Sequence, residues 1–196
     1  MQNIDINVIF GGSFNPPTIA HYEISKAIID KFKVNDFVFV PTSLNYGKKT
    51  LIDSKSRIEM LEIMCKHLPN CRVSDFEIKQ NKYKGTYFTL EHFKGYYFVM
   101  GADNLIEIET WKHFPDVVRE NKFIIFNRNN IDVESILNKE TLKDYKDNFL
   151  ILDNISIPNV SSSAYRETLD KRIVLSDVHE YVIKNKLYTR WFNEWK

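Results

Sequence analysis

The stretch "NVIFGGSFNPPTIAHYEISKAIID", residues 7–30, decides how this chain folds. It opens with a short apolar run that is typical of a buried strand, and the run stops at two adjacent glycines, Gly11 and Gly12. Two prolines then set φ ahead of a helical pattern that starts near Thr18. The stretch therefore predicts a strand, a sharp turn and a helix in direct succession.

The chemistry of this turn favours an anion. The first turn of a helix carries unpaired N–H groups and the positive end of the helix dipole, and both attract phosphate. Thr18 adds a hydroxyl, and His21 lies about one turn further along on the same side. Neither a G-x-G-x-x-G motif nor a P-loop is present. Turn chemistry alone leaves two interpretations open: a phosphate cradle, or an ordinary Pro-rich turn before a capped helix with a partly buried histidine.

The rest of the chain alternates short apolar runs with helical patterns. This alternation predicts a Rossmann-like α/β fold, a doubly wound parallel sheet with helices on both faces. Loops at Thr42–Ile52 and Ile78–Gly85 would surround the ligand crevice at the carboxyl ends of the strands. The expected strands are Asn7–Phe10, Asp36–Pro41, Arg72–Phe76, Tyr96–Met100, Lys122–Asn127 and Phe149–Leu152. The expected helices are Thr18–Phe32, Ser54–Leu68, Tyr87–Phe93, Phe114–Arg119, Val133–Asp144, Ser162–Asp170 and Asp177–Asn185.

Composition narrows the class of protein. A length of 196 residues, 43% of them hydrophobic, fits one packed domain, and a net charge of +1 argues against a nucleic-acid partner. The sequence shows no basic leader followed by an apolar segment, so we expect a cytoplasmic protein without membrane association. Cys65 and Cys71 have no companion Cys/His cluster, so we expect two reduced thiols.

Four segments carry a family resemblance. "GGSFNPPTIAH", residues 11–21, resembles the nucleotidyltransferase signature G-x-F-[DN]-P-x-[HT]-x-G-H, most closely that of the nicotinate/nicotinamide mononucleotide adenylyltransferases. "GADNLIEIETW" (101–111), "VSSSAYR" (160–166) and "VHEYVIKNKLY" (178–188) resemble three further motifs of the same family, in the same order. The resemblance implies a nucleotidyltransferase domain over residues 1–188 and a C-terminal tail over 189–196.

The resemblance also implies a reaction, the transfer of AMP from ATP to nicotinate mononucleotide by in-line attack without a covalent intermediate. Positioning and charge neutralisation would carry such a reaction. By resemblance, His21 would act as a protonated donor, Thr18 would hold the same phosphates, and Arg166 would grip the leaving β/γ-phosphates with its planar fork. The implied ATP-binding residues are Gly11, Gly12, Ser13, Phe14, Gly101, Asp103, Ser161 and Ser162. Taken alone, the serines also fit a plain helix cap, and Asp103 fits a cap of a helix at 104–107.

The acceptor side follows the family less closely. Trp111 matches the aromatic residue that stacks on the pyridine ring, although an ordinary core tryptophan is equally compatible with the residue itself. Thr86 in "KGTYFTL" (84–90) matches the first threonine of the nicotinate-specific pattern S-Y-T-x-D-T-L, whereas Lys84, Gly85 and Phe88 replace the serine, tyrosine and aspartate of that pattern. Lys84 could pair with a carboxylate or face water. The residues that we assign to the acceptor are Thr86, Trp111, Lys48, Lys49 and Arg57, although a solvated charge pair also explains the two adjacent lysines.

Three alternatives therefore stay open: nicotinate mononucleotide as acceptor, nicotinamide mononucleotide or another phosphorylated acceptor, and a non-catalytic nucleotide-binding module. The enzyme interpretation implies Mg²⁺ bound to ATP, and the sequence shows no acidic metal cluster. Trp191 and Trp195 in the tail lie four residues apart, on one face of a short helix. They would cover the core or a second subunit, which leaves a homo-oligomer open.

Overall fold

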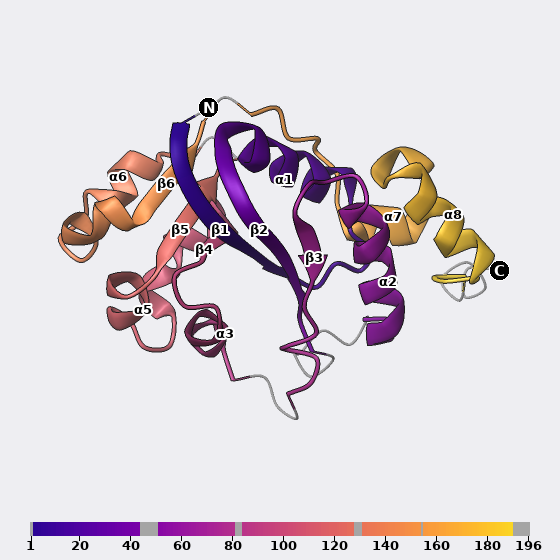
Figure 1. Cartoon of the computed structure of the whole chain (residues 1–196), viewed down its shortest axis with the longest axis horizontal. Coiled ribbons are helices and arrows are strands. Elements are labelled where there is room, and N and C mark those ends of the chain that lie inside the picture. Colours follow the sequence, from indigo (N-terminus) through magenta and orange to yellow (C-terminus); the bar gives the residue numbers. More distant parts are fainter. Residues whose placement is uncertain (1, 44–50, 81–83, 128–130, 154, 190–196) are drawn as a thin grey trace.

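The computed structural model describes residues 2–43, 51–80, 84–127, 131–153 and 155–189. It contains a six-stranded sheet, with all neighbouring strands parallel, in the order β3-β2-β1-β4-β5-β6 (Figure 1). This arrangement confirms the Rossmann-like doubly wound fold. The chain winds outward from β1 in both directions, so the crevice between β1 and β4 at the carboxyl ends of the strands is the expected ligand site. The strands are β1 (Gln2–Gly12), β2 (Phe32–Pro41), β3 (Cys71–Val73), β4 (Tyr97–Gly101), β5 (Lys122–Phe126) and β6 (Phe149–Leu152).

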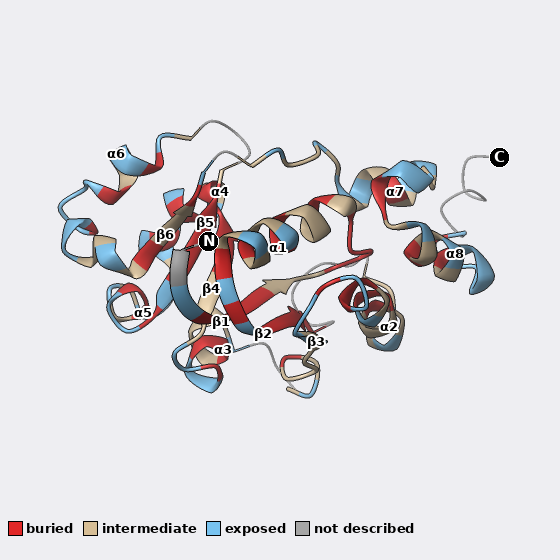
Figure 2. Ribbon diagram, turned by 45° about the horizontal axis from the view of Figure 1, so that its top comes forward, coloured by how far each residue is buried: buried red, intermediate tan, exposed pale blue. Residues whose placement is uncertain are grey.

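Helices cover both faces of the sheet, because successive side chains of a strand point to opposite sides. On β1, Val8 and Phe10 enter a core shared with α1 and α2, whereas Ile9 enters a second core shared with α3, α4 and α5. Buried residues follow the strands and the inward helix faces (Figure 2). The helices are α1 (Ile19–Lys31), α2 (Ser54–Cys65), α3 (Thr86–His92), α4 (Ala102–Ile106), α5 (Asp116–Arg119), α6 (Val133–Leu137), α7 (Ser162–Thr168) and α8 (Ser176–Lys184).

A third core lies at one end of the molecule, where α2, α7 and α8 gather (Figure 1). Met60 of α2 packs there with Tyr165 of α7, with Val178 and Val182 of α8, and with Tyr188 beyond α8. None of the described helices is long and apolar enough to cross a membrane. The expected tail helix with Trp191 and Trp195 falls outside the described residues.

Several boundaries differ from the prediction, and two of the differences are the most instructive. The helix expected over Val133–Asp144 ends at Leu137, and a 3-10 turn over Lys143–Asn148 follows it. Leu142 between them is buried in the second core, so tertiary packing rather than helical periodicity places this side chain. The strand β1 begins at Gln2, five residues earlier than its apolar run, because its first residues pair with β2.

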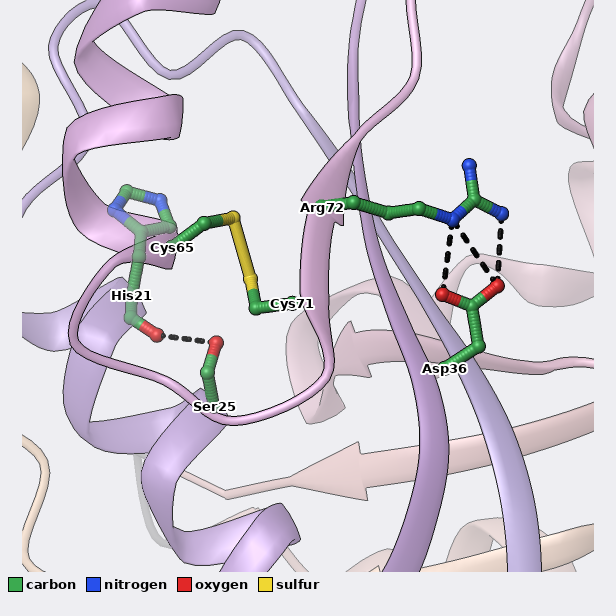
Figure 3. The surroundings of a disulfide bond; sticks show 6 residues. All are labelled: His21, Ser25, Asp36, Cys65, Cys71 and Arg72. Atoms are coloured by element: carbon green, nitrogen blue, oxygen red, sulfur yellow. Dashed lines mark hydrogen bonds and ion pairs between the residues drawn. A yellow bond between two sulfur atoms is a disulfide. The ribbon is translucent and has the colours of Figure 1, made fainter.

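The cysteines correct a second expectation. Cys65 at the end of α2 and Cys71 at the start of β3 form a disulfide bond (Figure 3), so the prediction of two reduced thiols is wrong. A tight connection returns the chain from α2 to the sheet and brings the two Cα atoms within 5.1 Å. The prediction failed because it used the number of cysteines and the cellular compartment, and neither shows which residues a turn brings together.

The same view shows how the edge strand β3 is fastened to β2. Arg72 donates hydrogen bonds to both carboxylate oxygens of Asp36, at 2.9 and 2.7 Å (Figure 3), and the Tyr96 hydroxyl donates to the same carboxylate. Burial alone would raise the pKa of Asp36, but the hydrogen bonds from Arg72 and Tyr96 outweigh it and lower that pKa. This bidentate contact stabilises the sheet at its edge, away from the β1–β4 crevice.

Candidate active site

The turn after β1 needs its glycines because aromatic rings lie directly against it. A Cβ on Gly12 would come within 3.0 Å of the Phe14 ring, and one on Gly11 would come within 3.1 Å of the Phe98 ring. Phe14 has a positive φ of 44° and a side chain only 1% exposed, so its ring belongs to the core and only its backbone belongs to the turn. Gly11, Gly12 and Ser13 line a cavity, and their expected contact with ATP stays a prediction.

The first helix begins with a reciprocal contact between Thr18 and His21. The backbone N–H of Thr18 donates to Nδ1 of His21 at 2.9 Å, and the Thr18 hydroxyl lies 2.8 Å from the same nitrogen. An imidazolium has a hydrogen on Nδ1 and cannot accept this bond, so the contact fits an unprotonated Nδ1, and a protonated His21 in the reaction stays a prediction. The tautomer that fits is neutral, with its hydrogen on Nε2. His21 can therefore donate to an anion through Nε2 while Nδ1 holds the helix N-terminus.

The second predicted helix entrance lies against this turn. Ser162 at the start of α7 donates to the carbonyl oxygen of Pro16 at 2.7 Å. Arg166, one turn later, donates to the carbonyl oxygen of Asn15 at 2.7 Å and to the Ser163 hydroxyl at 3.0 Å. Segments about 150 residues apart in the chain are thus tied together by side-chain-to-backbone hydrogen bonds.

Both entrances line one cavity of about 470 Å³. Thr18 and His21 contribute to it from α1, and Ser161 and Ser162 contribute from α7. Ser161 also caps α7, because its hydroxyl accepts the N–H of Ala164 at 3.1 Å. The cap and the cavity wall are therefore compatible functions of one residue. The remaining lining is largely apolar and includes Phe10, Ala20, Ile24, Phe126, Ile157, Pro158 and Val160.

The end of β4 brings Gly101 and Asp103 together. A Cβ on Gly101 would lie 2.2 Å from Oδ1 of Asp103, so the glycine makes room for that carboxylate. Sequence reasoning assigned this room to the nucleotide instead. Asp103 is in the first turn of α4, and Gly101 caps that helix through its backbone and lines the same cavity as Gly11.

The predicted acceptor residues Thr86 and Trp111 also lie in one place. Both line the cavity of about 260 Å³ that contains Gly11, Gly12 and Ser13. This cavity shares Phe10 and Phe126 with the His21 cavity, so the two adjoin across one pair of rings. A third cavity of about 300 Å³ again contains Thr86 and Trp111, now beside Gly85, Tyr87, Asn104, Glu107 and Lys112.

Arg57 lies beneath the site rather than in its wall. Its side chain is 0% exposed and donates to the carbonyl oxygens of Ser13 at 2.9 Å and Thr42 at 2.7 Å. Burial lowers the pKa of this guanidinium below its usual value, although the nearby Tyr188 and Asp53 oppose the shift. In this structure Arg57 fastens the β1 turn to the end of β2, and its expected contact with the acceptor stays a prediction. Lys48 and Lys49 fall outside the described residues.

Sequence reasoning missed Glu77 and left Lys84 unassigned. Glu77 is 8% exposed, lines the cavity of Thr86 and Trp111, and accepts a 2.6 Å hydrogen bond from Thr89. Burial raises the pKa of this carboxyl. Glu77 stands in a loop after a short strand, and no spacing motif marks it. The Lys84 ammonium lies 4.1 Å from the centre of the Phe88 ring, a cation–π contact between the residue before the N-cap of α3 and the first turn of that helix.

Comparisons with known proteins identify the family and agree with the fold. Residues 9–168 match the family described as cytidylyltransferase-like. The "Probable nicotinate-nucleotide adenylyltransferase" of Acholeplasma laidlawii (strain PG-8A) is 34% identical over 189 residues, covering 92% of this chain and 96% of the relative. The protein of the same name from Clostridium acetobutylicum is 32% identical over 195 residues, covering 92% and 97%.

A solved structure supports the same assignment. The Plasmodium falciparum nicotinic acid mononucleotide adenylyltransferase complexed with NaAD superposes with a TM-score of 0.76 at 26% identity, covering 94% of this chain and 97% of that one. The family match spans most of the chain, and the curated relatives match nearly end to end. This chain therefore belongs to the cytidylyltransferase-like family and, within it, to the nicotinate-nucleotide adenylyltransferases.

Proposed function

We propose that this protein transfers AMP from ATP to nicotinate mononucleotide, forming deamido-NAD and releasing pyrophosphate in NAD biosynthesis. One observation carries the proposal: the entrances of α1 and α7 line a single cavity that adjoins the cavity of Thr86 and Trp111. A triphosphate in the first and a pyridine mononucleotide in the second would bring the acceptor phosphate to the α-phosphorus. The names of the relatives favour the same substrates.

The chain's own groups have distinct tasks in this reaction. The attacking phosphate oxygen displaces pyrophosphate in line, so no protein nucleophile is needed, and charge develops on the phosphoryl oxygens. His21 donates through Nε2 to these oxygens, while Nδ1 stays bonded to Thr18 and keeps the tautomer. The Ser161 hydroxyl and the backbone N–H groups at the start of α7 add donors, whereas the hydroxyls of Thr18 and Ser162 already donate to His21 and to the carbonyl oxygen of Pro16. Arg166 adds positive charge from α7 and holds the turn through Asn15.

The remaining assignments concern recognition. Asp103 would accept hydrogen bonds from the ATP ribose, and the Trp111 indole would stack on the electron-poor pyridine ring. Thr86 would donate to the substituent of that ring. Among the described residues, no group of three or more His, Cys, Asp or Glu side chains is placed to hold a metal ion. We propose that Mg²⁺ enters with ATP, coordinated by phosphate oxygens and water, and that it neutralises charge on the triphosphate.

The test is an acceptor comparison. Purified protein with ATP and Mg²⁺ is given nicotinate mononucleotide or nicotinamide mononucleotide, and both dinucleotide and pyrophosphate are measured. The proposal predicts product from nicotinate mononucleotide at the higher kcat/KM. Higher kcat/KM with nicotinamide mononucleotide would change the acceptor and keep the reaction, an outcome that the altered segment 84–90 motivates. Tight ATP binding without pyrophosphate release would indicate a non-catalytic module instead.

A further inference from the structure

The C-terminal motif ends in contact with the turn between β1 and α1, residues 13–18, which we call the catalytic turn. Tyr188 closes the segment Val178–Tyr188, which the proposed reaction leaves without a task. Its side chain is 4% exposed, and its hydroxyl donates to Oδ1 of Asn15 at 3.0 Å, across 173 residues of chain. The last motif of the sequence therefore makes direct contact with the first.

Within the catalytic turn, Asn15 accepts hydrogen bonds from three other parts of the chain. Its Oδ1 accepts from Tyr188 and, at 3.4 Å, from the backbone N–H of Ile52, while its carbonyl oxygen accepts from Arg166. These donors come from three separate segments of the chain. Three residues after Asn15, the backbone N–H of Thr18 fixes the tautomer of the histidine. A shift of Asn15 would therefore move the groups that contact the triphosphate.

We propose that Tyr188 is a positioning residue, whose hydroxyl holds Asn15 and thereby the turn that presents Thr18 and His21 to ATP. The proposal rests on the proposed adenylyl transfer and assigns part of it to the C-terminal segment. Burial raises the pKa of the Tyr188 hydroxyl above its usual value, so the group keeps the proton that it donates. Small displacements of positioned groups cost rate more than stability, because the reacting atoms must be aligned.

The chain offers a matched control in Tyr165. This side chain is 0% exposed, belongs to the same core as Tyr188, and the two rings meet edge-on at 6.3 Å. Its hydroxyl lies 2.9 Å from Nδ1 of His179 on α8, not in the catalytic turn. Replacing Tyr165 by Phe therefore removes one buried hydroxyl and one hydrogen bond from the same core without touching Asn15.

The experiment compares Tyr188→Phe with Tyr165→Phe at a temperature where both are fully folded. We expect Tyr188→Phe to lower kcat about tenfold with little change in the KM of the acceptor. Tyr165→Phe should keep the wild-type kcat, while both variants lose similar stability in urea. A wild-type kcat for Tyr188→Phe, or an equal loss for Tyr165→Phe, would overturn the proposal.

A second readout separates this proposal from the proposed function. The ¹⁵N resonances of the His21 imidazole report its surroundings without any turnover. Tyr188→Phe should shift them, and Tyr165→Phe should not. If the wild-type protein made no product with either acceptor, the proposed function would fail, and these resonances alone would decide whether Tyr188 positions the turn. Unshifted His21 resonances in Tyr188→Phe would overturn the positioning role in either case.

Discussion

The two cavities that meet at Phe10 and Phe126 are assembled in different ways. The His21 cavity is lined by two helix entrances, each set by local spacing, and hydrogen bonds from α7 to the carbonyls of Asn15 and Pro16 tie these entrances together. The Trp111 cavity is lined by the carboxyl ends of β1 and β4 and by single residues from several connections, among them Thr86 and Glu77. We therefore expect substitutions of the single residues in the second cavity to alter acceptor preference while the phosphate-binding groups of the first cavity stay in place. Thr86 of the altered segment 84–90 lines the second cavity.

The largest effect on activity is expected from a substitution in the His21 cavity. His21→Ala removes a donor aimed at developing charge, and we expect kcat to fall by about 10²–10³. His67→Ala is the matched control, because that imidazole is on the surface and bonded to Asp177. Steady-state pyrophosphate release measures both variants. An unaffected His21→Ala enzyme would remove His21 from the mechanism.

Arg57 links the catalytic turn to the neighbouring strand, so its loss should act on stability. Arg57→Met removes two short charge-assisted hydrogen bonds to the carbonyls of Ser13 and Thr42. Because these buried carbonyls then lose their donor, we expect the free energy of unfolding to fall by about 2–4 kcal/mol. Arg72→Met, which removes an exposed ion pair, should cost about 1 kcal/mol or less. Urea unfolding of the two variants measures both losses of stability. Equal losses would contradict a structural role specific to Arg57.

Gly101 tests the nucleotide side without straining the backbone, since its φ is −72°. A Cβ there must displace the Asp103 carboxylate, whose Oδ1 is buried, so Gly101→Ala should raise the KM for ATP about tenfold and should also lower stability. Gly95→Ala is the control: its φ of +85° disfavours a side chain, which costs about 1 kcal/mol of stability and leaves the affinity for ATP unchanged. If Gly101→Ala bound ATP normally, Asp103 would not be a ribose ligand.

The smallest expected effect concerns the acceptor side and pH. The pKa of Glu77 is raised by burial, so the folded protein keeps a proton that the unfolded chain releases near pH 4.3. Stability contributed by this group is complete below that pH and is lost as pH rises through the higher folded pKa. Glu77→Gln should lack this loss, with a difference of about 1 kcal/mol at neutral pH. Urea midpoints between pH 4 and 8 test it, with the exposed Glu91→Gln as control; parallel curves for Glu77→Gln and wild type would contradict the raised pKa.

The sequence predicted those parts of the molecule that depend on local pattern. Strand runs and the helix after Thr18 follow from residues close together in the chain. The convergence of that turn with the Ser161 segment, about 150 residues away, was expected only from the family resemblance. Arg57 was assigned to the acceptor, because a cation after a strand does not reveal that its guanidinium turns inward. Glu77 and the Tyr188–Asn15 contact were missed for a related reason. Tertiary packing creates both, and no spacing in the sequence encodes which distant residues become neighbours.

The central claim is that α1 and α7 hold one triphosphate between them, and an NMR titration tests it most directly. Protein labelled with ¹⁵N is titrated with Mg-ATP while the imidazole of His21 and the backbone amides of Ser162 and Ser163 are followed. The account predicts that all of them shift along one saturation curve with a single Kd, and that the resonances of surface-exposed His67 stay in place. Shifts in the resonances of only one helix entrance, or two saturation curves with different Kd values, would contradict a triphosphate shared by α1 and α7.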